Sequence, residues 1–115
     1  MAVHRAAASF PRSGFAPLRS QLTRAADSIA ANIVEGCAAI SQKEFARFLE
    51  IAIKSAAEAE YHLLCAHERA ALSASDYGTL ASEAVQIRRM LFALRERVLT
   101  SADAPPRDHT TRPEP

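Results

Sequence analysis

The chain has no proline between Pro17 and Pro105, and its three glycines lie far apart. Proline ends or kinks an α-helix because its ring removes a backbone hydrogen-bond donor, so this interval is open to long helices. Alanine, the strongest helix former, supplies 25 of the 115 residues. These features predict an all-α protein.

Length and charge narrow the class of protein further. A chain of 115 residues holds a single core, and 14 basic against 13 acidic residues give no strongly basic domain. No apolar run is long enough to span a bilayer, and the N-terminus lacks the apolar stretch of a signal peptide. The two cysteines, Cys37 and Cys65, are too few for a disulfide framework. We therefore expect a cytoplasmic protein with no membrane partner.

Apolar residues at alternating spacings of three and four predict three helices, at about 17–36, 42–71 and 74–100. Gly36 is expected to close the first helix in a left-handed conformation. Ser41–Glu44 forms a capping box that starts the second. The sequence therefore predicts a helical bundle over residues 17–101.

The two ends of the chain differ from this bundle. Residues 1–16 read as a short helix followed by a turn, and residues 102–115 hold four of the six prolines and are expected to be disordered. The predicted fold is an antiparallel up-down bundle of the four-helix type with a truncated first helix.

Some apolar residues fall outside the core stripes of the second and third helices. Three helices cannot easily cover these extra stripes, so either a fourth helix or another subunit must, since contiguous apolar patches on a soluble protein are usually interfaces. We therefore expect self-association through these residues: Phe48, Ile51, Val85, Phe92 and Leu99.

Four polar residues of the first two long helices are candidates for a buried cluster: Asn32, Glu35, Ser55 and Glu58. A buried polar side chain must find hydrogen-bond partners. The cluster is interpreted either as a clamp that fixes helix register or as a pocket for a ligand or an RNA group.

Charge is segregated along the chain although the net charge is only +1. Residues 1–26 hold four arginines and no acidic residue. Arginines near both ends of the bundle segment are expected to gather at one pole and bind nucleic-acid phosphates: Arg12, Arg19, Arg24, Arg95 and Arg97. The alternative is that these arginines complement helix dipoles and keep the surface soluble.

Motifs for catalysis are incomplete. The run His67–Ala71 begins like a zinc-protease helix but lacks the second histidine, and no Glu-x-x-His pair of a di-iron bundle occurs. We expect no catalytic residue, cofactor, metal ion or small-molecule substrate.

Two motifs in the first long helix carry a family resemblance. They are Gln-Leu-x-Arg-Ala-Ala at 21–26 and Ser-Ile-x-Ala-Asn-Ile-x-Glu-Gly at 28–36. Through them, residues 10–99 resemble the four-helix-bundle family called the 23S rRNA-intervening sequence proteins. The resemblance implies an up-down-up-down bundle and a homo-oligomer, commonly a pentameric ring. It also implies distant kinship to an accessory protein of retroelements that binds a reverse transcriptase and nucleic acid.

The family's first helix is longer than the nine residues that precede Phe10 here. Either an upstream start codon precedes Met1, or a neighbouring subunit fills the groove, and sequencing the upstream reading frame would distinguish these.

Three functional hypotheses follow from the residues and the resemblance. The first is a non-catalytic homo-oligomeric scaffold that contacts RNA or an RNA-associated protein, such as a reverse transcriptase, through the arginines. The second is a purely structural protein partner without nucleic-acid contact. The third is a small-ligand binder that uses Asn32, Glu35 and Glu58.

Overall fold

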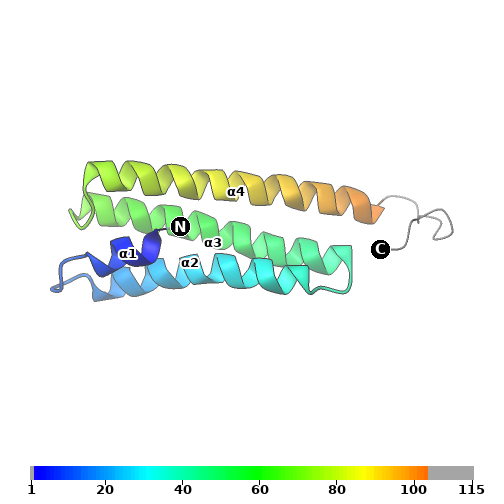
Figure 1. Ribbon diagram of the computed structural model, residues 1–115, viewed down its shortest axis with the longest axis horizontal. Helices are drawn as coiled ribbons and strands as arrows, with labels where there is room; N and C mark the ends of the chain where they lie inside the picture. Colours follow the sequence, from blue (N-terminus) through cyan, green and yellow to red (C-terminus); the bar gives the residue numbers. More distant parts are fainter. Residues whose placement is uncertain (1, 104–115) are drawn as a thin grey trace.

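The computed structural model describes residues 2–103, with side chains to residue 101. These residues form four helices and no strand: α1 (Val3–Ala8), α2 (Ala16–Cys37), α3 (Gln42–Glu68) and α4 (Ala74–Asp103). The long helices are antiparallel, with α3 between α2 and α4 and packed extensively on both, while α1 packs on α2 (Figure 1). The prediction of an all-α antiparallel bundle is confirmed. Of the expected tail, residues 102 and 103 still belong to α4, and 104–115 lie outside the described residues.

Serine caps start two of the long helices. The Ser41 hydroxyl accepts a hydrogen bond from the backbone N–H of Glu44 at 3.1 Å, and the Ser73 hydroxyl accepts one from Asp76 at 3.1 Å. Each bond satisfies a donor that has no partner inside the helix. The starts of α3 and α4 are therefore encoded locally.

The helix ends differ from the sequence-based expectation. Gly36 does not take the left-handed conformation expected of it and is a buried helical residue of α2. At the end of α3, Ala70 is left-handed with a φ of 62°, and the N–H of Ala71 donates to the carbonyl of Ala66 at 2.8 Å. This Schellman-type closure ends α3 at Glu68, before the predicted residue 71. An alanine gave no signal of it, because glycine usually occupies this position.

Replacing Ala70 with glycine should stabilise the protein by about 1 kcal/mol, since the Cβ of alanine is unfavourable in the left-handed region. Ala57, which is exposed in the middle of α3, provides the matched control. There the same change should destabilise by about 1 kcal/mol. Urea unfolding followed by circular dichroism measures both, and two changes of the same sign would contradict the left-handed assignment.

The core lies along α3. Its inward row is fully buried over the length of the helix and consists of Leu49, Ala52, Ala56, Ala59, Leu63 and Ala66. Alanines in this row let α2 and α4 approach closely. This alanine-rich row is the face on which both neighbours pack.

The short helix α1 covers α2 near one end of the bundle. Val3, Ala7 and Phe10 are buried, and Arg19 on α2 donates from Nε to the carbonyl of Ala7 at 3.0 Å. Figure 1 places the α1–α2 turn beside the α3–α4 connection. We call this the turn end, and we call the opposite end, with the α2–α3 connection at 38–41 and the end of α4, the hairpin end.

Candidate functional site

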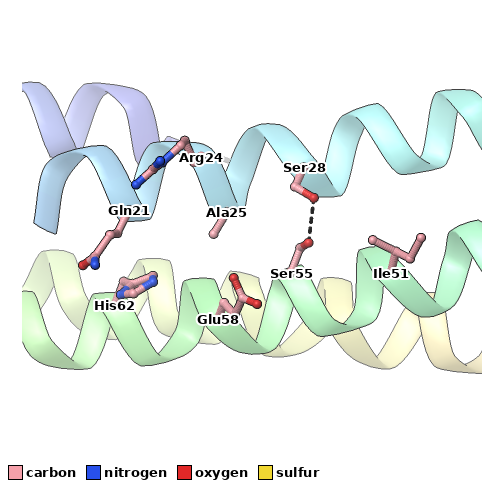
Figure 2. Close-up of a pocket in the computed structure, with 8 residues that line it drawn as sticks. All are labelled: Gln21, Arg24, Ala25, Ser28, Ile51, Ser55, Glu58 and His62. Atoms are coloured by element: carbon pink, nitrogen blue, oxygen red, sulfur yellow. Dashed lines mark hydrogen bonds between the residues drawn. The ribbon is translucent and has the colours of Figure 1, made fainter. Parts of the chain in front are cut away.

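An open groove of about 500 Å³ runs between α2 and α3. Residues about one helical turn apart share a face, so each helix contributes a row of side chains. The lining residues are Gln21, Arg24, Ala25 and Ser28 from α2 and Ile51, Ser55, Glu58 and His62 from α3 (Figure 2). Figure 2 shows Gln21 extending toward His62, so polar groups of both helices meet across the groove.

A ladder of hydrogen bonds crosses the groove near its Ile51 end. The hydroxyls of Ser28 and Ser55 are 2.7 Å apart, and Ser55 is buried (Figure 2). The side-chain amide of Asn32 donates to the Ser28 carbonyl at 2.8 Å and to its hydroxyl at 3.1 Å. The ladder thus satisfies polar groups at the close contact of α2 with α3.

The structure separates the four residues expected to form the buried cluster. Asn32 and Ser55 belong to the ladder and are joined through Ser28, whereas Glu35 and Glu58 are exposed. Glu35 precedes the buried Gly36, and consecutive helical residues point about 100° apart, so Glu35 faces away from α3. Glu58 lines the groove without being buried. Burial of both carboxylates was therefore a wrong prediction.

Ser28 and Ser55 are not arranged like a nucleophilic serine beside its base. Their hydroxyls bond to one another, and the Ser28 hydroxyl also accepts from the Asn32 amide. Within the described residues neither is hydrogen-bonded to a histidine that could act as a base. Among residues 2–101, no three His, Cys, Asp or Glu side chains gather closely enough to hold a metal ion. The groove can offer hydrogen bonds, one guanidinium, one carboxylate and one imidazole to a ligand.

The predicted arginine pole does not form. Arg12 and Arg19 lie at the turn end and Arg24 lines the groove, while Arg95 lies toward the hairpin end, 3.6 Å from Glu50 near the start of α3. Arg97 follows Arg95 on α4, away from the first three. Three antiparallel helices put the start of the first and the end of the third at opposite ends, which makes the gathering impossible. Phosphate binding by these residues stays a prediction.

The residues expected at a subunit interface occupy two places. Phe48 and Ile51 lie on the α2 side of α3, where the Cβ of Phe48 is close to Gly36 and Ile51 lines the groove. Val85, Phe92 and Leu99 form a row on α4, in which Phe92 is 54% exposed and the other two are half-buried.

Ion pairs join α3 to α4 beside this row. Arg88 donates to both carboxylate oxygens of Glu60, and the hydrogen bond and the charge of Glu60 raise the pKa of the Arg88 guanidinium. On the exposed back of α3, hydrogen bonding to Cys65 and its charge raise the pKa of the Tyr61 phenol, with smaller contributions from desolvation and Glu68. Both groups therefore keep their protons at neutral pH.

Sequence reasoning missed two residues that organise these regions. Ser28 connects Asn32 to Ser55, and its position four residues before Asn32 was a usable signal. Arg69 donates to the Gly14 carbonyl at 3.0 Å and lies 4.8 Å from the centre of the Phe15 ring. A contact over 55 residues has no local signal in the sequence.

Comparisons with known proteins agree with the fold. Residues 1–93 match a family model described as "23S rRNA-intervening sequence protein". A crystal structure of a protein of unknown function from the S23 ribosomal protein family of Bacteroides thetaiotaomicron superposes with a TM-score of 0.70 at 24% sequence identity. The match covers 81% of this chain and 97% of that one. No curated protein matches the sequence. Within residues 2–103, no helix has the length and apolar character needed to cross a membrane.

Proposed function

Because the chain belongs to the 23S rRNA-intervening sequence protein family, we propose that it acts as a non-catalytic scaffold that binds further copies of itself. The observation that carries this proposal is the apolar row Val85, Phe92 and Leu99 on α4. Its members recur every seven residues and share one face of the helix. Among the helices of residues 2–103, only α3 packs extensively against α4, and Phe92 remains 54% exposed.

The charges around Phe92 support an interface at this row. Arg88 and Arg95, one turn before and after Phe92, pair with Glu60 and Glu50 of α3. An approaching subunit would meet guanidiniums that are already paired, so less desolvation would oppose the burial of Phe92. Aromatic side chains in this position are common centres of binding energy.

Replacing Phe92 with glutamate should convert the oligomer to a monomer while its helices persist. Loss of one central aromatic costs at least about 2 kcal/mol of association, or about 30-fold in the dissociation constant. Light scattering coupled to size-exclusion chromatography measures the effect. The wild type should have a mass that is a multiple of 12.5 kDa, with five copies the number that the family resemblance implies.

Met90→Glu is the matched control. Met90 is 70% exposed, but it lies two residues from Phe92 and therefore about 200° around α4. This variant should keep the mass of the wild type. A monomeric wild type at micromolar concentration, or equal dissociation of both variants, would refute self-association through this row.

A further inference from the structure

The turn end carries a positive charge that the hairpin end lacks. Segments 2–24 and 67–76 meet around the turn end and hold five arginines against two acidic residues, a net charge of +3. Segments 29–50 and 89–103, which form the hairpin end, hold five basic and five acidic residues. The asymmetry therefore concentrates the positive potential of the bundle at one end.

Three arginines surround the exposed turn between α1 and α2. Arg19 donates from Nη2 to the carbonyls of Phe10, at 3.4 Å, and of Pro11, at 3.2 Å. Arg69 reaches the same turn from the end of α3 through its bond to Gly14. Arg12 is an exposed residue of the turn itself. We call Arg12, Arg19 and Arg69 the turn-end arginines.

No carboxylate in the described part of the chain pairs with any of the three. The partners of Arg19 and Arg69 are neutral carbonyls and the Phe15 ring. In contrast, Arg88 and Arg95 are paired with glutamates. The hydrogen bonds to the turn explain the positions of Arg19 and Arg69. They do not compensate the charges of these two guanidiniums, and they do not involve Arg12.

These guanidiniums are also partly immobilised. The Phe15 ring lies under the Arg69 guanidinium, and two nitrogens of Arg19 are held by backbone oxygens. A guanidinium has five N–H donors, so each of these arginines keeps donors for a further acceptor. Positive groups fixed before binding lose little side-chain entropy when an anion arrives.

We propose that the turn-end arginines bind the phosphate backbone of a nucleic acid. Several separate guanidiniums around one exposed turn fit a ligand with regularly spaced phosphates better than a single small anion. The ring of Phe15 is already covered by Arg69 and is therefore not free on that face to stack on a base. Binding should therefore depend on charge and be nearly independent of base sequence.

The test uses the full chain and a fluorescently labelled RNA duplex in an anisotropy titration. With three phosphate contacts, affinity should fall about 40-fold between about 50 and about 200 mM salt. Arg12→Glu should weaken binding about tenfold and reduce the salt slope by about one. A second duplex of unrelated sequence should bind with the same affinity.

Arg47→Glu is the control because it makes the same charge change on an exposed arginine near the start of α3, at the hairpin end. It should leave affinity within about twofold of the wild type, and circular dichroism should be unchanged in both variants. Equal losses in the two variants would overturn the assignment to the turn end. Absence of RNA binding at the lower salt would overturn the proposal. Binding to vesicles of phosphatidylglycerol without binding to RNA would overturn it as well.

Discussion

Replacing Leu63 with alanine should lower the free energy of unfolding by about 3 kcal/mol. Leu63 has no exposed surface and lies in the inward row of α3, which both neighbouring helices cover. Truncation removes buried methyl and methylene groups and leaves a cavity. Close packing of rigid helices allows only partial collapse around it, so the cavity adds to the lost transfer energy.

The effect is measured by urea unfolding at one fixed protein concentration, since self-association would couple to stability. The chain has no tryptophan, so circular dichroism is the suitable probe. Met90→Ala removes a similar amount of side chain from a residue that is 70% exposed and should change the unfolding free energy by less than about 0.5 kcal/mol. Similar losses at both positions would mean that α3 is not the centre of the core.

Periodicity predicted the long helices because their burial repeats along each helix. The spacing of Leu49, Ala52 and Ala56 already gives the face on which α2 and α4 pack. The serine caps were predictable for the same reason, since a cap acts within four residues. The end of α3 was not predictable, because Ala70 adopts a left-handed conformation that its Cβ disfavours.

The candidate site was less predictable because it depends on which helices lie side by side. Asn32 and Ser55 were identified by their polarity on buried faces, but the residue that joins them, Ser28, depends on the register between α2 and α3. The prediction of an arginine pole was wrong because of the helix order. In three antiparallel helices the start of the first and the end of the third lie at opposite ends, so Arg19 and Arg95 are far apart. Arg69 lies beside the turn where Arg95 was expected.

Gly36 has a different role from the predicted one. It was expected to end α2 through a left-handed conformation, but it is helical and buried where α3 begins. A Cβ at this position would lie 2.9 Å from Cδ1 of Phe45 and 3.3 Å from Cβ of Phe48. The Phe45 ring could rotate away, whereas the Cβ of Phe48 is fixed to the backbone of α3.

Replacing Gly36 with valine should therefore destabilise the protein by about 2 to 3 kcal/mol, because its branched side chain needs the space that both phenylalanines occupy. Gly78→Ala is the matched control, since beyond the adjoining backbone of α4 and the two neighbouring residues nothing lies within 4 Å of a Cβ there. That change should stabilise α4 by up to about 1 kcal/mol through helix propensity alone. Urea unfolding of the two variants must then give opposite signs. If Gly36→Val also stabilised the protein, the close approach of α2 to Phe45 and Phe48 would be wrong, since propensity would be the only effect left.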